Sequence, residues 1–371
     1  MYIKTQKAAV IGLATLALTA CVKEKTAVVD ATSYDSYTYF NLNTNAVVEL
    51  TDEEAAASTD WHLGFKRFGV ILNGGDSGPG AVSGALAAAQ DDFYIDGEPN
   101  VDVFLAATPA GELDHLKATY DLSTLSFLVD TKQSAIAVPG TISGTVYDLG
   151  WFNYDLVTHQ ISLNSENWWL LRSNNGDAFA KFHATALTYN PAVGLDVTFE
   201  FDVQPSGSAS FTQTATFNAV LPPAGGEVCF DFDTDTQLDC ANDQWDLKLD
   251  VAGRDWNLWT NSGVSGSGSG GAFGPLDTAT ANTYTSGTHA PTGELIVFLY
   301  QVDKSAGVFE ESSWYAYNLQ GGHKLWPNFR TYIIDTDNDD EASVKYKFQI
   351  TDYYSEGGAS GHVSIRHLKV K

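Results

Sequence analysis

The chain has 371 residues, of which 46 are acidic and 20 basic, and its formal net charge is −26. A field of that sign repels phosphate groups, which excludes nucleic acid and anionic lipid surfaces as partners. The 17 tyrosines, 20 phenylalanines and 9 tryptophans stand in short runs among 33 glycines, so we expect an all-β, mostly antiparallel protein. Its length predicts two domains.

The N-terminus has the order of a lipoprotein signal peptide. Lys4 and Lys7 precede an apolar run over residues 8–18, which ends in Leu-Thr-Ala before Cys21. The run is too short for a permanent membrane span. We expect residues 1–20 to be removed, Cys21 to be lipidated, and residues 21–30 to form a tether. The protein would then be anchored to the outer membrane only through its lipid, on the periplasmic or cell-surface side.

An aromatic strand and a flexible loop follow the tether. Trp61, Leu63 and Phe65 alternate with His62, Gly64 and Lys66, so one strand face can bury large side chains. The Asn-Gly-Gly at 73–75 tolerates positive φ angles and predicts a tight reversal. No Gly-Lys-Ser/Thr ending follows, so this loop is not a phosphate cradle.

The two halves of the sequence repeat the same blocks in the same order. We therefore expect a tandem duplication, with one repeat at 31–204 and the other at 205–371, divided near a Pro-Ser-Gly or a Pro-Pro-Ala-Gly-Gly stretch. The matching blocks are 39–50 with 229–240, 61–63 with 245–247, 72–86 with 260–276, 151–163 with 314–326, and 180–190 with 346–356.

Cys229 and Cys240 are the cysteines that remain beside Cys21. They bracket a strand-turn-strand segment in an exported chain, which predicts a disulfide. Asp335–Glu341 places oxygen ligands at alternate positions but lacks the glycine and terminal glutamate of an EF-hand, so calcium is not expected. Asp231, Asp233 and Asp235 alternate on a predicted strand and are assigned no metal.

Several of these blocks together resemble the HmuY-like family of haem-binding outer-membrane lipoproteins. They are the Trp-x-Leu strand with "LNGGDSGPG", then "WFNYD" and "LLRSNNGDAFAKF", and the resemblance extends over both repeats. It implies an HmuY-like β fold for each repeat, with haem or a related porphyrin held between loops. It also implies delivery of haem to a TonB-dependent outer-membrane receptor.

Haem iron needs axial ligands, which the family takes as a pair from two separate loops. Met1 is the only methionine and is lost with the signal peptide, so histidine is expected, with tyrosine as the second choice. His159 and His323 follow Trp151 and Trp314 in matching loops of the two repeats. The resemblance implies His159 and His115 as the iron pair, with His323 as the counterpart in the second repeat.

An enzyme is not expected, because the sequence has no G-x-S-x-G elbow, no H-E-x-x-H helix and no Cys-His nucleophile context. The alternative to haem binding is a non-catalytic surface module for glycans or a protein partner. Trp168, Trp169 and Trp326 would then provide its contacts.

Overall fold

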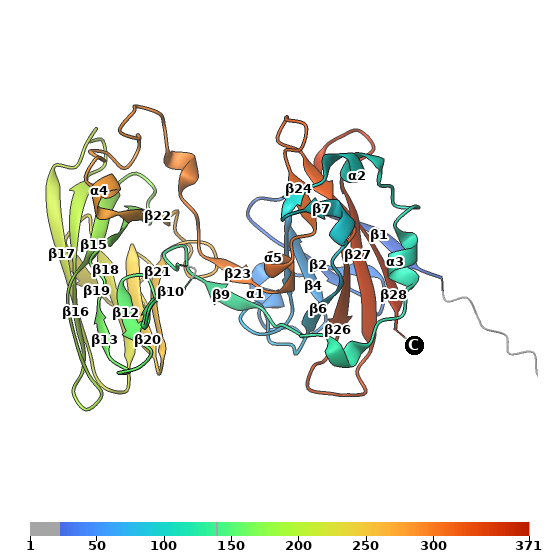
Figure 1. The fold of residues 1–371 in the computed structure, drawn as a ribbon, viewed down its shortest axis with the longest axis horizontal. Helices are drawn as coiled ribbons and strands as arrows, with labels where there is room; N and C mark the ends of the chain where they lie inside the picture. The colour runs from blue at the N-terminus through green and yellow to red at the C-terminus, as the bar shows by residue number, and fades with distance from the viewer. Residues whose placement is uncertain (1–22, 139, 371) are drawn as a thin grey trace, which may run out of the picture.

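The computed structural model describes residues 23–138 and 140–370, so the predicted signal peptide over residues 1–20 and the predicted lipidation site, Cys21, lie outside the described residues. The chain is mostly antiparallel β structure, which confirms the predicted all-β class. Figure 1 shows two lobes joined by a narrow connection. Within the described ranges, no helix has the length and apolar character needed to cross a bilayer.

The lobe that contains both chain ends is called the terminal lobe (residues 23–130 and 307–370). It packs two antiparallel sheets around a core that includes Phe40, Phe65 and Ile365. The larger sheet has the order β1 (Lys25–Asp30), β28 (Ser360–Lys369), β27 (Lys345–Tyr354), β26 (Thr331–Asp335) and β6 (Ser83–Ala88). The smaller sheet has the order β3 (Ala46–Val48), β2 (Thr38–Asn41), β4 (Leu63–Lys66) and β5 (Gly69–Leu72).

The other lobe is called the central lobe (described residues in 134–303) and has an aromatic core around Phe182, Phe199 and Phe217. Its larger sheet has the order β17 (Gln213–Leu221), β16 (Gly194–Gln204), β15 (Phe179–Asn190), β14 (Asn167–Arg172) and β22 (Gly271–Asp277). Two four-stranded sheets complete it: β19 (Thr236–Leu238), β18 (Gly226–Asp231), β20 (Leu247–Ala252) and β21 (Asp255–Thr260), and then β10 (Thr141–Ser143), β11 (Val146–Asp148), β12 (Phe152–Asp155) and β13 (Ile161–Leu163).

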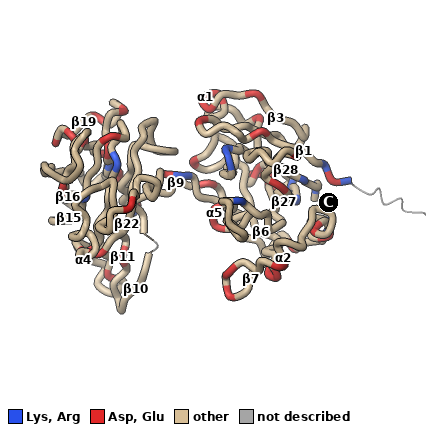
Figure 2. The backbone as a smooth tube through the Cα atoms, turned by 90° about the horizontal axis from the view of Figure 1, so that it is seen from above, with Lys and Arg blue, Asp and Glu red and all other residues tan. Residues whose placement is uncertain are grey.

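Each lobe also contains short strands and helices outside these sheets. The terminal lobe adds β7 (Tyr94–Ile95) with β8 (Glu98–Pro99), β24 (Tyr315–Tyr317) with β25 (Leu325–Pro327), and the helices α1 (Asp52–Ala55), η1 (Asp91–Phe93), α2 (Val101–Ala106), α3 (Leu113–Lys117), η2 (Leu122–Thr124) and α5 (Val308–Glu311). The central lobe adds α4 (Thr278–Ala281) and η3 (Val297–Leu299). Acidic residues are spread over both lobes (Figure 2).

The connection between the lobes is a pair of antiparallel strands, β9 (Thr131–Gln133) and β23 (Lys304–Ala306). The chain leaves the terminal lobe through β9 and returns through β23 (Figure 1). We call residues 131–134 and 304–307 the crossing. Because the two segments pair with each other, they run straight past one another and neither turns back into its own lobe.

The lobes do not follow the predicted division at 204/205. That boundary falls between β16 and β17, which pair along their length from Leu195 with Leu221 to Val203 with Gln213. In the terminal lobe, β1 pairs with β28, so the first described strand and the last strand are neighbours. Each lobe therefore contains strands from both predicted repeats, because the chain changes lobe at the crossing.

Cys229 and Cys240 form a disulfide, as predicted, with their Cα atoms 5.2 Å apart. Cys229 on β18 is fully buried and packs with Trp245 and Trp259. The bond therefore links β18 to the segment that follows β19 and closes the β18–β19 hairpin.

We expect the double variant Cys229→Ala/Cys240→Ala to lose about 2–3 kcal/mol of unfolding free energy, because the bond closes a short loop in the unfolded chain. Urea denaturation with and without reductant measures this. The parent protein should shift on reduction and the double variant should not. A variant as stable as the oxidised parent would contradict the prediction.

Candidate functional site

A hairpin of the central lobe presents a tyrosine and a histidine that contact each other. Tyr154 lies on β12, and its hydroxyl is 2.7 Å from Nδ1 of His159 in the β12–β13 turn. Asp155 shapes this turn, because its carboxylate accepts hydrogen bonds from the backbone N–H groups of Val157 and Thr158. The bond from Thr158, with those from the Thr145 hydroxyl and Val157, lowers the pKa of Asp155 to about 2. The turn therefore holds His159 beside Tyr154 at a φ of 58°.

The terminal lobe repeats this arrangement in its β24–β25 hairpin. The hydroxyl of Tyr317 is 2.6 Å from Nδ1 of His323, which has a φ of 55°. Here the side chain of Asn318 fixes the turn, since its Oδ1 accepts a hydrogen bond from the backbone N–H of His323 at 2.9 Å. Different turn residues thus produce the same tyrosine–histidine pair in both lobes.

Each pair leaves one ring nitrogen of the histidine available. Nδ1 is occupied by the tyrosine hydroxyl, which donates or accepts according to the tautomer of the imidazole. Metal-binding histidines generally use one ring nitrogen as the ligand while a hydrogen bond at the other fixes the ring. His159 and His323 are both exposed, so Nε2 is the atom of each pair that can meet a ligand.

The central hairpin also carries a row of apolar and aromatic side chains across its sheet. Cross-strand pairing places Ile142 opposite Tyr147, Tyr147 opposite Tyr154, and Tyr154 opposite Ile161. Directly paired residues lie on the same face of a sheet, so these four side chains form one stripe beside His159. Ile142 is 63% exposed, which leaves an open face for a flat, apolar ligand.

The two hairpins start from equivalent buried tryptophans. Trp151 and Trp314 are both buried, and each carbonyl oxygen accepts a hydrogen bond from an asparagine N–H, Asn164 at 3.2 Å and Asn328 at 3.0 Å. The predicted match of residues 151–163 with 314–326 therefore corresponds to matching surroundings in space.

His115, the predicted partner of His159, lies in the other lobe. It is on α3, which contacts β27 and β28 at the far side of the terminal lobe (Figure 1). One chain does not bring His115 and His159 together, because the crossing places their sequence segments in different lobes. The predicted iron pair of His159 with His115 is therefore corrected.

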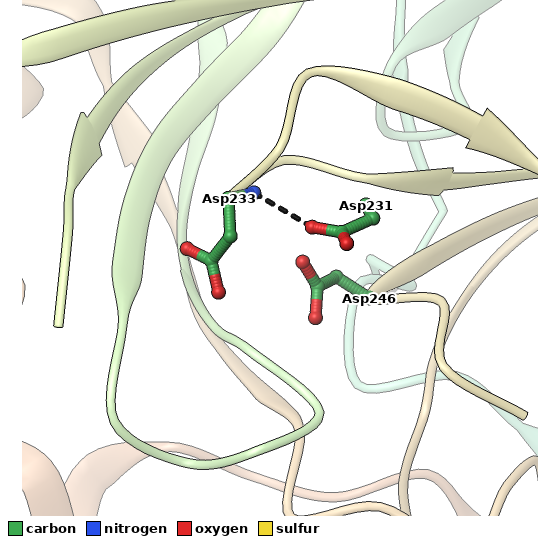
Figure 3. A group of neighbouring side chains, drawn as sticks. All are labelled: Asp231, Asp233 and Asp246. Atoms are coloured by element: carbon green, nitrogen blue, oxygen red, sulfur yellow. Dashed lines mark hydrogen bonds between the residues drawn. The ribbon is translucent and has the colours of Figure 1, made fainter.

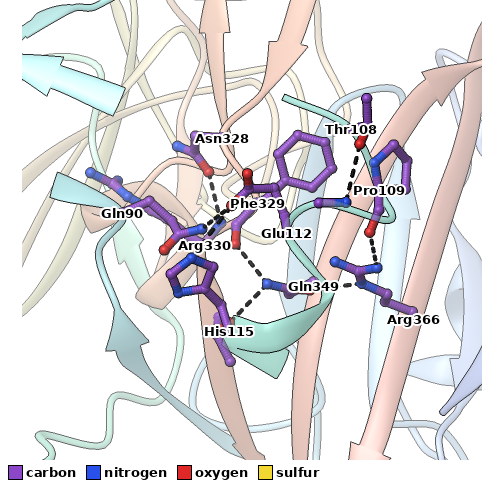
Figure 4. Close-up of polar contacts among 12 residues, drawn as sticks. Gln90, Thr108, Pro109, Glu112, His115, Asn328, Phe329, Arg330, Gln349 and Arg366 are labelled. Carbon is purple, nitrogen blue, oxygen red and sulfur yellow. Dashed lines mark hydrogen bonds and ion pairs between the residues drawn. The ribbon is translucent and has the colours of Figure 1, made fainter. Parts of the chain in front are cut away.

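His115 belongs to a polar network that fastens the α2–α3 segment to the large sheet (Figure 4). Its Nε2 is 3.5 Å from Glu112, which also accepts a hydrogen bond from the Gln90 side chain. Beside it, the Arg366 guanidinium donates to Gln349 and to the backbone oxygen of Pro109. These contacts give His115 a structural role in the terminal lobe.

A cluster of carboxylates, Asp231, Asp233 and Asp246, lies in the central lobe within 4.8 Å (Figure 3). The predicted strand through Asp235 is wrong: β18 ends at Asp231, and the turn after it brings Asp233 back toward Asp246. Asp231 accepts the N–H of Asp233, and Asp246 accepts those of Asn174 and Phe232. Backbone donors thus use two of the three carboxylates, and we assign no metal here.

The alternative hypothesis, a surface module for glycans or a protein partner, assigned the contacts to three tryptophans. Most of their ring surface packs against other side chains of the protein. Trp169 is fully buried in the central core. Trp168 stacks on His183 with ring centroids 3.5 Å apart and donates a hydrogen bond to Thr278. Trp326 lies half-buried beside the cluster around Phe93 and Phe329.

Sequence reasoning identified His159 and His323 but missed their tyrosine partners. The signal was present, because aligning "WFNYD" with "WYAYN" places Tyr154 opposite Tyr317. Both tyrosines stand at the same spacing after the tryptophan. The row from Ile142 to Ile161 depends on strand pairing, which the sequence alone did not define.

Comparison with known proteins gives one family. A family model described as HmuY protein matches residues 33–201. Two solved structures match at 10% identity: an HmuY-like heme binding protein from Bacteroides vulgatus ATCC 8482 (TM-score 0.32, 94% of this chain and 92% of that chain) and an apo HmuY analog from Tannerella forsythia (TM-score 0.29, 94% and 96%). No curated protein matches. Over residues 33–201, the chain is therefore similar to the HmuY family.

Proposed function

We propose that this protein binds haem or a related porphyrin through its tyrosine–histidine hairpins. The observation behind the proposal is the duplicated contact between a tyrosine hydroxyl and histidine Nδ1, which leaves Nε2 as a ligand atom in each lobe. The match of residues 33–201 to the HmuY family model supports this proposal.

The central hairpin fits a porphyrin best. Nε2 of His159 would hold the iron while Tyr154 orients the imidazole from Nδ1. The stripe of Ile142, Tyr147 and Ile161 would cover one face or edge of the ring through apolar contact. The terminal hairpin has only two strands, so His323 would bind with less apolar contact.

In the cell, we propose a non-catalytic lipoprotein anchored to the outer membrane through Cys21. It would pass haem to a TonB-dependent receptor. The exposed position of the hairpin turns supports such a transfer, because the cargo could be released without opening a core.

A haemin titration monitored in the Soret region tests the proposal. We expect a Soret shift in the parent, with His159→Ala weakening haemin binding by at least about tenfold and Tyr154→Phe by a smaller factor, since the tyrosine acts through the histidine. His323→Ala should remove only the weaker of two binding steps. His289→Ala is the matched control, because His289 is an exposed loop histidine that contacts only its neighbour Thr288 in its side-chain bonds.

Two results would contradict haem binding at these hairpins. One is a parent protein without a Soret shift at stoichiometric haemin. The other is a double variant His159→Ala/His323→Ala that titrates like the parent.

A further inference from the structure

The larger and the smaller sheet of each lobe have the same strand order as their counterparts in the other lobe. The sheet order β1-β28-β27-β26-β6 in the terminal lobe corresponds to β17-β16-β15-β14-β22 in the central lobe. The smaller sheet β3-β2-β4-β5 corresponds likewise to β19-β18-β20-β21. In each pair of sheets, the equivalent strands stand in the same order within the two predicted repeats.

Each lobe combines the first half of one repeat with the second half of the other. The terminal lobe takes β2–β6 from the first repeat, together with β1 just before it, and β26–β28 from the second repeat. The central lobe takes β17–β22 from the second repeat and β14–β16 from the first. The family match over residues 33–201 agrees with this division, because that continuous unit is shared between the two lobes.

Cores in both lobes join these half-repeats. In the central lobe, the Trp151 ring from the first repeat stacks on Trp256 from the second, with centroids 6.0 Å apart. In the terminal lobe, Trp314 from the second repeat donates a hydrogen bond to the backbone oxygen of Phe68 from the first, at 3.0 Å. The halves of each lobe are therefore packed as parts of one core.

The crossing itself is symmetric. Asp130 and Asp303 are the last residues before the two segments, and each carboxylate accepts a backbone N–H in the lobe that its chain is leaving: Leu72 at 2.8 Å and Thr260 at 2.9 Å. Both carboxylates also reach the segment that arrives from the other repeat. Asp303 accepts the N–H of Ala135 at 2.8 Å, and Asp130 Oδ1 would lie 2.1 Å from a Cβ placed on Gly307.

The end of each first half thus lies against the start of the other repeat's second half. A turn at residues 131–134 would lead the first repeat into the position now occupied by residues after 307, and a turn at 304–307 would do the reverse. These short segments distinguish exchanged lobes from closed ones, since the strands of the larger and smaller sheets of one lobe have equivalents in the other.

We propose that the lobes result from a reciprocal exchange of half-repeats, maintained by the short, straight crossing. Each repeat contains every strand type of a complete lobe and closes on itself when the crossing segments are long enough to turn. Short connections of this kind favour exchange over closure.

The full mature chain tests this with a protease site inserted after Gly207, in the exposed β16–β17 loop, where no atom would lie within 4 Å of an added Cβ. After cleavage, we expect the two fragments to elute as one complex of unchanged size in native buffer and to separate only in denaturant. Fragments that separate in native buffer would overturn the exchange.

A second variant tests closure. Six Gly/Ser residues are inserted in both crossing segments, after Lys132 and after Ser305, and the same site is cut after folding. We expect this nicked protein to separate natively into two folded fragments of about half the mass, detected by size-exclusion chromatography and circular dichroism.

The matched control carries the same insertion in the exposed β15–β16 turn, between Ala192 and Val193. Its nicked fragments should stay together as in the parent. A folded crossing variant whose fragments also stay together would overturn the claim that the short crossing prevents closure. Separated fragments that are unfolded would overturn the claim that each repeat closes on itself.

Discussion

Gly263→Ala is expected to lower the free energy of unfolding by about 3 kcal/mol or more, and Gly75→Ala by a similar amount. Both glycines have positive φ angles, 57° and 62°. An added Cβ would lie 1.8 Å from the backbone oxygen of Asp303 at Gly263, and 2.0 Å from that of Asp130 at Gly75. The backbone at the crossing must therefore move in either variant. Urea denaturation of the full chain measures the loss.

Gly97→Ala is the control for the backbone angle alone. Gly97 has a φ of 86°, and nothing lies within 4 Å of its added Cβ. We expect it to cost only about 1 kcal/mol, the strain of a left-handed alanine. Equal losses of unfolding free energy in all three variants would contradict the prediction, because they would show that the close contacts of Gly75 with Asp130 and of Gly263 with Asp303 add nothing to the cost of the left-handed alanine.

The local structure around these glycines was predictable from the sequence. Trp61, Leu63 and Phe65 are buried as their alternation predicted, and the reversal after Leu72 places Gly75 at positive φ. Hydrophobic alternation and turn residues act over a few positions, so the sequence displays them directly. His62 and Gly64 are buried as well, because the His62 ring accepts the N–H of Leu42 and the side chains of Ile71 and Tyr39 lie over Gly64.

The assignment of strands to lobes was not predictable in this way. A half-repeat has the same hydrophobic pattern whether it packs on its own repeat or on the other one, since the partner surfaces are equivalent. Which repeat a half-repeat packs against depends on the two four-residue segments of the crossing, in which Lys132 pairs with Ser305. Nothing in the composition of these segments distinguishes a straight strand from a turn.

The same reason explains which part of the candidate site was predicted. His159 and His323 were found because each follows its tryptophan within one local hairpin. The pairing of His159 with His115 needed the tertiary arrangement, and the crossing separates the two residues. Local duplication was therefore a reliable guide to the histidine of each hairpin, and a poor guide to contacts between distant segments.

Three buried aspartates have a raised pKa: Asp130 and Asp303 beside the crossing, and Asp246 in the central lobe. Burial is the main cause that raises the pKa of Asp130 and of Asp303 to about 6. Burial raises the pKa of Asp246 further, to about 8, with the nearby Asp233 and Asp231 adding to the effect. Asp246 accepts the N–H of Phe232, as the His62 ring accepts that of Leu42 in the terminal lobe. The central lobe thus buries an acid where the terminal lobe buries an imidazole.

These values predict that stability falls as the pH rises. A carboxyl group whose pKa is raised in the folded state stabilises the protein fully below its unfolded pKa, and this contribution is lost as the pH rises to the folded pKa. The stabilising contributions of Asp130 and Asp303 are mostly lost by about pH 6. Between about pH 6.5 and 8, the fall in stability therefore comes mainly from Asp246. The buried His62 and His367, whose pKa values burial lowers to about 4, act mainly below this window.

We therefore expect the unfolding free energy to fall by about 2 kcal/mol between pH 6.5 and 8, close to the limit for one titrating group. Urea denaturation at both pH values measures this fall. Asp246→Asn should make the stability nearly constant over the window, even though it loses one of the two backbone N–H bonds and is less stable at pH 6.5. Asp255→Asn, at the exposed start of β21, should retain the parent slope. Within the described part of the chain, Asp246 is the carboxyl group whose pKa is raised to about 8. An Asp246→Asn protein that keeps the full parent slope would therefore contradict the prediction.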